Sequence, residues 1–494
     1  MASSEGQQQA ETEPAHSADR RMRIALFVLC AATFLDSLDV SMVGVALPSI
    51  KRDLGMSTAE AQWLISGYTV AYGGFLLLGG RVADLFGRRK VFLAAMCLFA
   101  VASLLGGVVS IGPLLIATRV VKGLGAAFTA PAALSIITTS FREGPERNRA
   151  LGLFAATAAS GYSIGLVMSG LLTEVNWRLV FFVPTIVAVI VVIIARFVVR
   201  SDEAESGSRR SLDLGGTLAV TGGLLLFVYG VVQAPTEGWT SPATLGTLAG
   251  AVILLGIFLL VEKRQRDPAV PLVIFRSRTL STANIMAVLF GCASIGWQFV
   301  ATLYLQQFLH YSPLKTALAV LPLGVAVLVV AQFVAPRLID WVGIRVVAGT
   351  GVLIQATGIA MFAFAGVHGN YPEIMLPGLL LHGIGNGLVF PTMNIAGVSG
   401  VDNRRQGVAG GLVTASVQIG CGLGTAVLAG VLAAETLGST AAGVFHGYRI
   451  AFFTAALFAV VSSAVAWIGL RPRGASQAPD RAASPDAAAE PARG

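Results

Sequence analysis

Charged residues are scarce in this sequence and are missing altogether from long stretches of it. Asp, Glu, Lys and Arg make up 12% of the chain, whereas 55% is hydrophobic. Soluble proteins contain about 25% charged residues, so this composition argues against an ordinary soluble protein. Apolar runs of about twenty residues recur along the chain, and each is long enough to cross a bilayer as a helix. The sequence therefore predicts an all-α membrane protein.

Signatures of cofactor or metal chemistry are also lacking. The four cysteines share no metal-ligand spacing and all lie inside apolar runs: Cys30, Cys97, Cys292 and Cys421. No Gly-x-x-x-x-Gly-Lys-[Ser/Thr] loop is present, and the glycine runs at 383–387 and 420–424 lie inside apolar runs without a preceding strand. We therefore expect no enzymatic activity, no ATP hydrolysis, no cofactor, no metal site and no nucleic-acid partner.

The apolar runs define the expected topology. We predict fourteen spans at 24–46, 60–80, 90–110, 113–138, 148–172, 178–199, 212–233, 243–261, 281–305, 315–335, 346–366, 374–398, 406–433 and 449–470. Residues 1–19 lack the apolar core of a signal peptide, so the first span itself should direct insertion. The polar ends, 1–20 and 474–494, have a composition typical of disordered cytoplasmic tails.

The basic residues are distributed asymmetrically between the two sets of loops. One set contains most of the 34 lysines and arginines, and the other contains only Lys51, Arg52, Arg178, Lys315 and Arg449. Loops rich in Lys and Arg face the cytoplasm. This pattern predicts a multi-pass protein of the cell membrane with both termini in the cytoplasm.

An internal repeat divides the chain. The segments "RVADLFGRR" (81–89) and "RLIDWVGIR" (337–345) both read Arg-x-x-Asp-x-x-Gly followed by Arg, and both lie at predicted cytoplasmic turns. Parallel repeats of this kind are typical of transporters. The offset of eight spans predicts two six-helix bundles, at 21–200 and 263–473, with a linker at 201–211 and two inserted helices at 212–262.

Several motifs resemble those of one transporter family. "GGRVADLFGRRK" (79–90) resembles the signature between helices two and three of the major facilitator superfamily. "LDVSMVGVALP" (38–48) and "YLQQFLHYSPLKTALAVLP" (304–322) resemble its fourteen-helix drug:proton antiporter branch, the EmrB/QacA type, and "TRVVKGLGAA" (118–127) resembles its fourth-helix motif. The resemblance implies two bundles that rock around a cavity at the membrane midplane, with efflux driven by proton entry.

The resemblance assigns roles to three groups of residues. A conformational latch is implied at Gly80, Arg81, Asp84, Gly87, Arg88 and Arg89, and its repeat at Arg337, Asp340, Gly343 and Arg345. The packing face of the fifth helix keeps Gly161, Gly165 and Gly170. Three positions depart from the family pattern: Leu166 and Ser169 replace the usual Pro and a Gly of this helix, and Lys122 replaces an amide in the fourth. The first departure weakens the case for strict antiport.

Four charged residues lie inside predicted spans. Asp36 and Asp39 share one helix face, as do Arg119 and Lys122. At about 1.5 Å of rise per residue, Asp39 matches Arg119 in depth and Asp36 matches Lys122. We therefore expect two salt bridges and assign proton coupling to Asp39 ahead of Asp36, because Asp39 belongs to the family motif. A static network that holds the two helices together is the alternative.

Aromatic and amide side chains suit a large, loosely selective cavity. The candidates are Tyr68, Tyr72, Trp297, Gln298, Tyr304 and Asn386. His382 is the only histidine inside a predicted span and can titrate near neutral pH.

We infer a monomeric transporter in the lipid bilayer that exports small amphipathic drugs or metabolites in exchange for protons. Two alternatives remain open at this point. One is a proton-coupled transporter of a single, anionic metabolite that Arg119 and Lys122 would bind. The other is a membrane sensor without transport activity.

Overall fold

The described part of the chain is built from helices alone. The computed structural model describes residues 3–141, 145–199, 214–238, 240–265, 272–399, 401 and 406–470. The predicted linker 201–211 and the tail 474–494 lie outside these residues. Among the described residues, eleven helices are long and apolar enough to cross a membrane, so the prediction of an all-α membrane protein is confirmed.

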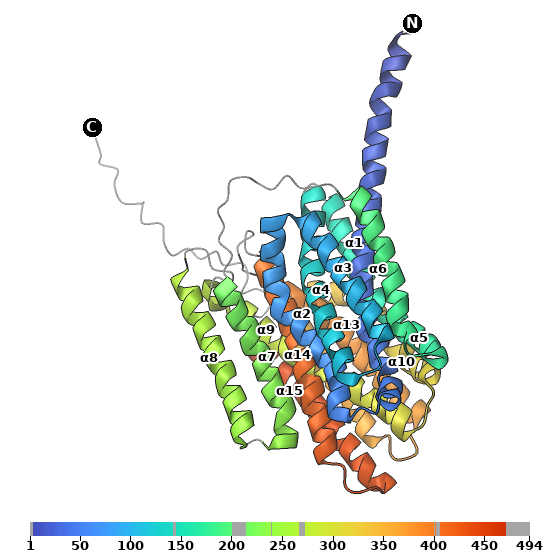
Figure 1. The fold of residues 1–494 in the computed structure, drawn as a ribbon, viewed down its shortest axis with the longest axis vertical. Helices are drawn as coiled ribbons and strands as arrows, with labels where there is room; N and C mark the ends of the chain where they lie inside the picture. Colours follow the sequence, from blue (N-terminus) through green and yellow to red (C-terminus); the bar gives the residue numbers. More distant parts are fainter. Residues whose placement is uncertain are drawn as a thin grey trace, which may run out of the picture.

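The helices fall into two groups and an inserted pair (Figure 1). The first group comprises α1 (Ser3–Asp53), α2 (Thr58–Phe86), α3 (Arg88–Val108), α4 (Gly112–Ser140), α5 (Pro145–Val175) and α6 (Leu179–Val198). The inserted pair is α7 (Leu214–Glu237) and α8 (Pro242–Arg264). The second group comprises α9 (Arg278–Leu303), α10 (Pro313–Val329), α11 (Ala335–Val342), α12 (Ile344–Met361), α13 (Leu376–Val398), α14 (Gln406–Ala434) and α15 (Ala441–Gly469).

Short irregular turns extend or join several of these helices. Three are π-helical: η2 (Tyr304–Phe308) continues α9, η3 (Val330–Val334) joins α10 to α11, and η5 (Tyr371–Met375) precedes α13. Two are 3₁₀ turns: η1 (Leu272–Arg276) precedes α9, and η4 (Phe362–Phe364) continues α12. The predicted spans therefore match these helices and their extensions to within two residues, and residues 212 and 213 of the seventh span lie outside the described residues.

Local sequence explains where the helices begin. At the start of α2, Ser57 and Glu60 form a capping box, in which the Ser57 amide donates to Glu60 Oε2 (2.8 Å) and the Glu60 amide donates to Ser57 Oγ (3.1 Å). Helix α1 begins at Ser3 and so includes most of the segment for which composition predicts disorder. The Ala, Glu and Gln residues of that segment are strong helix formers.

Two large contacts join the groups, and the inserted pair covers one of them. Helix α2 packs against α14, and α5 packs against α10. Helix α7 lies against both α2 and α14, where Thr221 Oγ1 donates to the Gly74 carbonyl (2.7 Å). Helix α8 packs mainly against α7 and stands at the edge of the bundle (Figure 1).

The largest hydrophobic core joins the two groups and contains residues of both, for example Leu38 and Phe452. A smaller core pairs Val70 of α2 with Ala426 of α14. A core around Phe92 belongs to α1–α6 alone, and one around Leu388 belongs to η3 and α11–α13. The two groups therefore share cores and also have cores of their own.

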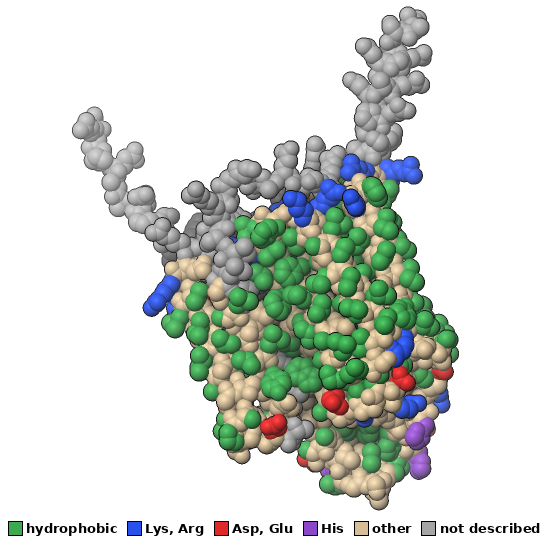
Figure 2. All heavy atoms as spheres, in the orientation of Figure 1, with side chains coloured by type: hydrophobic (Ala, Val, Ile, Leu, Met, Phe, Trp, Pro, Cys, Tyr) green, Lys and Arg blue, Asp and Glu red, His purple; other side chains and the backbone are tan. Residues whose placement is uncertain are grey.

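Charge distinguishes the two ends of the molecule. In Figure 2 a flank of hydrophobic side chains lies below a rim of Lys and Arg, and Asp, Glu and His lie mainly toward the opposite end. At this rim Arg21 donates to the carbonyls of Phe197 (3.0 Å) and Val198 (3.1 Å), and Arg89 donates to the Arg196 carbonyl. The segment of α1 around Arg21, the start of α3 and the end of α6 therefore meet at the basic rim.

The closest helix contact in the second group depends on glycine. A Cβ added at Gly424 of α14 would collide with the backbone of Cys292 in α9, whereas one added at Gly246 of α8 would meet nothing. We expect Gly424→Leu to destabilise the protein by about 1–3 kcal/mol or more, as overpacking does, and Gly246→Leu to be neutral. Thermal unfolding of both variants in detergent tests this. Equal melting temperatures would contradict the packing seen at Gly424.

Candidate functional site

Three charged side chains meet in the interior of the first helix group. Asp39 of α1 is fully buried, and its two carboxylate oxygens accept hydrogen bonds from Arg119 Nη1 and Lys122 Nζ of α4. Both basic side chains are only 1% exposed. We call Asp39, Arg119 and Lys122 the charge triad. Burial on this scale is tolerated because each charge has an opposite partner.

The remaining donors of the triad bind other helices. Arg119 Nε donates to the Leu64 carbonyl of α2 (2.8 Å), and its guanidinium lies 4.5 Å from the centre of the Tyr68 ring. Lys122 Nζ also donates to Ser103 Oγ of α3 (2.8 Å). Ser103 in turn donates to the Phe181 carbonyl of α6 (2.8 Å). The triad therefore connects α1, α2, α3, α4 and α6.

Small residues allow the helices to come close enough for these contacts. A Cβ at Gly123 of α4 would collide with the Tyr68 carbonyl of α2. A Cβ at Gly79 of α2 would likewise collide with the carbonyl of Ala127, which lies one helical turn after Gly123 in α4. At the neighbouring Gly80, which the sequence analysis assigned to the latch, an added Cβ would make only an ordinary contact with Pro131, 3.7 Å away.

The second predicted salt bridge, between Asp36 and Lys122, is wrong. Lys122 binds Asp39, and no described residue makes a hydrogen bond to either carboxylate oxygen of Asp36. Asp36 is nevertheless 96% buried, since only 4% of it is exposed. Matched depth along the helices predicted that α1 and α4 bring these charges together. The long side chain of Lys122 then reaches the neighbouring acid rather than the one at its own level.

The predicted latch lies at the basic rim. Helix α2 ends at Phe86 and α3 begins at Arg88, with Gly87 between them at φ 94°. Asp84 and Arg88 form a partly exposed ion pair (3.5 Å), and Arg89 donates to α6 as described above. Arg81 lies half-buried in the last turns of α2.

The repeat of the latch has the same backbone turn. Gly343 separates α11 from α12 at φ 86°, close to the angle at Gly87. Arg345 lies over the Trp467 ring at 5.6 Å, whereas Arg337 donates to the Phe333 carbonyl of its own helical segment. Asp340 is exposed in α11. The two turns thus match in backbone geometry but differ in their side-chain partners.

Helix α5 lies between the charge triad and the second helix group. Gly161 and Gly165 face the backbone of α1, at Phe34 and Leu38, so closely that a Cβ on either would collide. Gly170 faces α10, where an added Cβ would lie 2.6 Å from the Ala317 Cβ. The three glycines chosen from the fifth-helix motif are therefore all at helix contacts, but with two different helices.

Polar contacts cross the boundary between the two groups. Tyr162 of α5 donates to Gln298 Oε1 of α9, and Gln306 Nε2 of η2 donates to the Val45 carbonyl of α1 (2.8 Å). In the other two contacts, Ser66 Oγ donates to the Gly422 carbonyl (2.9 Å) and the Leu314 amide donates to Glu174 Oε1 (3.2 Å). We call these four contacts the seam. The sequence analysis did not single out Tyr162, Ser66 or Glu174, although Tyr162 directly follows Gly161 of the fifth-helix packing face.

The structure does not bring the predicted cavity residues together. Tyr68 belongs to the charge triad and packs edge-on against Tyr72 at 6.0 Å between ring centres. Gln298 belongs to the seam. Tyr304 lies in an aromatic cluster and donates to the Gly366 carbonyl (2.6 Å). Of the six, only Tyr72 and Asn386 are not buried, and the cavity assignment stays a prediction.

Trp297 and Asn386 flank a buried histidine in the second group. His382 of α13 packs against the Trp297 ring of α9, with 4.5 Å between ring centres. Both side chains are 1% exposed, and neither Trp297 Nε1 nor His382 Nδ1 has a hydrogen-bond partner among the described residues. Asn386 lies one helical turn after His382 and is partly buried. This cluster is polar but carries no acid.

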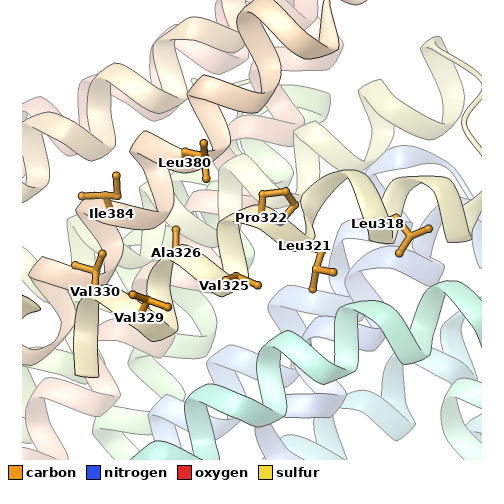
Figure 3. Close-up of a pocket in the computed structure, with 9 residues that line it drawn as sticks. All are labelled: Leu318, Leu321, Pro322, Val325, Ala326, Val329, Val330, Leu380 and Ile384. Carbon is orange, nitrogen blue, oxygen red and sulfur yellow. The ribbon is translucent and has the colours of Figure 1, made fainter. Parts of the chain in front are cut away.

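One apolar pocket lies on the outside of the second group. It has a volume of about 530 Å³ between α10 and α13. Leu318, Leu321, Pro322, Val325, Val329 and Leu380 line it with Ala326, Val330 and Ile384 (Figure 3). Its walls carry no charged side chain, so it is distinct from the charge triad.

Comparison with known proteins identifies the family. The sequence model of the Major Facilitator Superfamily matches residues 29–425. The chain belongs to this superfamily, and the family prediction made from the motifs is confirmed.

Relatives and solved structures agree with this assignment. The chain is 35% identical to the puromycin resistance protein pur8 of Streptomyces alboniger, over 93% of each chain. It is 36% identical to the cephamycin export protein CmcT of Amycolatopsis lactamdurans, over 88% of this chain and 90% of the relative. The fold is similar to that of the POT family transporter PepTSo, with a TM-score of 0.66 and 17% identity over 90% of this chain and 97% of that one.

The two acids of α1 make a direct test of this site possible. We expect Asp39→Asn to destabilise the protein by about 3–5 kcal/mol, because removal of one partner leaves buried charges uncompensated. Asp36→Asn removes no hydrogen bond and is expected to leave the melting temperature unchanged. Thermal unfolding and size-exclusion profiles in detergent compare the two. A larger fall in melting temperature for Asp36→Asn than for Asp39→Asn would contradict this account of the triad.

Proposed function

We propose that this protein exports small amphipathic compounds across the cell membrane in exchange for protons. The relatives support an efflux role, since their names refer to puromycin resistance, cephamycin export, and tetracenomycin C resistance and export. The observation that carries the proton-coupled part is the set of buried charges on α1 and α4. Ionisable residues inside membrane spans mark ion pathways and proton relays.

The membrane topology follows from charge and helix length. We extend the eleven apolar helices to fourteen spans by adding α2, α5 and α7, which are equally long and pack among the others. The basic rim would then face the cytoplasm, with both termini on that side. This division gives two six-helix bundles and two inserted helices, with the protein acting as a monomer.

The arrangement of the cores supports an inward-facing conformation. The part of the shared core that α1–α6 contribute and the seam contact of Glu174 with the start of α10 lie away from the basic rim. At the rim the two groups have separate cores. Transport would therefore require the seam to open and the rim ends to close, with the turns at Gly87 and Gly343 moving against their neighbours.

The coupling site would consist of Asp36 and Asp39 with Arg119 and Lys122 as charge partners. A proton that enters the site neutralises a carboxylate and changes the attraction between α1 and α4. The alternative function, binding of a single anionic metabolite by Arg119 and Lys122, receives less support. Both basic side chains already bind Asp39.

Transport in proteoliposomes tests this function. We expect the purified protein to accumulate puromycin or tetracenomycin C against its gradient when a pH gradient is imposed, and to release protons when drug is added. A host without its own efflux pumps should also gain resistance to both compounds. Transport of a single metabolite without drug resistance would favour the alternative function. Binding without transport would favour a sensor.

A disulfide across the seam tests the proposed motion. A Cβ at Gly324 of α10 would lie 3.3 Å from the Ser163 Cβ of α5, near the Cβ separation of about 3.8 Å found in disulfides. We expect oxidised Gly324→Cys/Ser163→Cys protein to lose transport and to regain it on reduction. The single variants, in a background without the exposed Cys97, provide the control. Full transport by the cross-linked protein would exclude opening at this seam.

A further inference from the structure

Asp36 and Asp39 lie one helical turn apart but have opposite surroundings. Both carboxylate oxygens of Asp39 are bound by basic side chains. Asp36 is equally removed from solvent, yet none of the described residues donates to it. A buried carboxylate without a donor is costly, and the cost is relieved when the group binds a proton. The two acids are therefore suited to different roles.

The charges around Asp36 allow it to exist with or without its proton. The titratable groups that act on it electrostatically are Asp39 on its own helix, Lys122 on α4, and Tyr68 and Tyr72 on α2. The charge triad has one acid and two bases, so it carries one net positive charge. That charge favours ionised Asp36, whereas burial and Asp39 favour the protonated form. Unlike Asp39, Asp36 therefore has no bound counter-charge of its own among the described residues.

Protonation of Asp39 would have a different consequence. A proton on Asp39 would neutralise the carboxylate that both Arg119 and Lys122 bind and would leave two positive charges close together. It would also weaken contacts that hold α1, α2, α3 and α6 around α4. Asp36 can gain and lose a proton without breaking any of these hydrogen bonds.

We propose that Asp36 carries the transported proton and that Asp39 is the fixed anion that anchors the triad. This inference rests on the proposed proton antiport. In each cycle the O–H bond of the Asp36 carboxyl breaks and the proton passes to water on the cytoplasmic side. The carboxylate then takes up a proton from the opposite side. Lys122, which already senses Asp36 electrostatically, is the counter-charge for the ionised state. The family motif favoured Asp39 over Asp36 as the residue that binds the proton, and this proposal reverses that preference.

Infrared difference spectroscopy tests the proton carrier without any transported compound. Full-length protein in lipid is titrated with pH while the carbonyl stretch of a protonated, buried carboxylic acid is followed. We expect this band in the wild type and its loss in Asp36→Asn. The band should persist in Glu435→Gln, a control that removes a partly exposed carboxylate outside the site. A band that survives Asp36→Asn would overturn the proposal.

Transport of puromycin provides the functional arm. We expect Asp36→Asn to lose accumulation driven by a pH gradient while it keeps puromycin counterflow, which needs no net proton movement. Asp36→Glu should retain coupling. The proposal would be overturned by coupled transport in Asp36→Asn, by a fall in its melting temperature, or by loss of its counterflow.

The infrared arm also separates this proposal from the proposed function. Wild-type protein that shows the Asp36 band but no effect of pH on puromycin flux would overturn proton antiport and leave the proton assignment standing. Coupled wild-type transport together with a band lost only in Asp39→Asn would overturn the assignment and leave antiport standing.

Discussion

The ionic contact of Asp39 with Arg119 and Lys122 is the constraint on which the first helix group depends. A charge at mid-membrane costs about 2.5–3.5 kcal/mol even on the lowest scale, so these groups can be buried only together. Their remaining hydrogen bonds reach α2, α3 and α6. The contact therefore fixes the positions of five helices, and the close approach at Gly123 is a consequence of the same geometry.

The sequence was sufficient to predict the helices, the family and the meeting of α1 with α4. A rise of about 1.5 Å per residue gives the depth of each charge in the membrane, and the matched depths predicted that the four charged groups lie close together. It does not give the reach of a side chain. Lys122 extends past its own level to Asp39 and leaves Asp36 without a partner. The predicted cavity residues are dispersed in the structure for a related reason, because an aromatic side chain in a span can face its own bundle, as Tyr304 does.

The repeat in the sequence is a repeat of backbone more than of chemistry. Gly87 and Gly343 adopt nearly the same φ at equivalent turns, which preserves the hinge in both halves. The interiors differ. The first half contains the charge triad, whereas the interior of the second half contains the His382–Trp297 pair with no acid beside it. If protons drive transport, proton binding in the first half has to change the packing of the second half.

Helix α5 provides the mechanical connection between them. On one side Gly161 and Gly165 place its backbone directly against α1, within two turns of Asp36 and Asp39. On the other side α5 meets α10 through Gly170 and α9 through Tyr162. Contacts between backbones leave no flexible side chain to absorb a small shift, and packed interfaces of this kind move between discrete arrangements. A change of charge beside α1 would therefore reach the seam through α5.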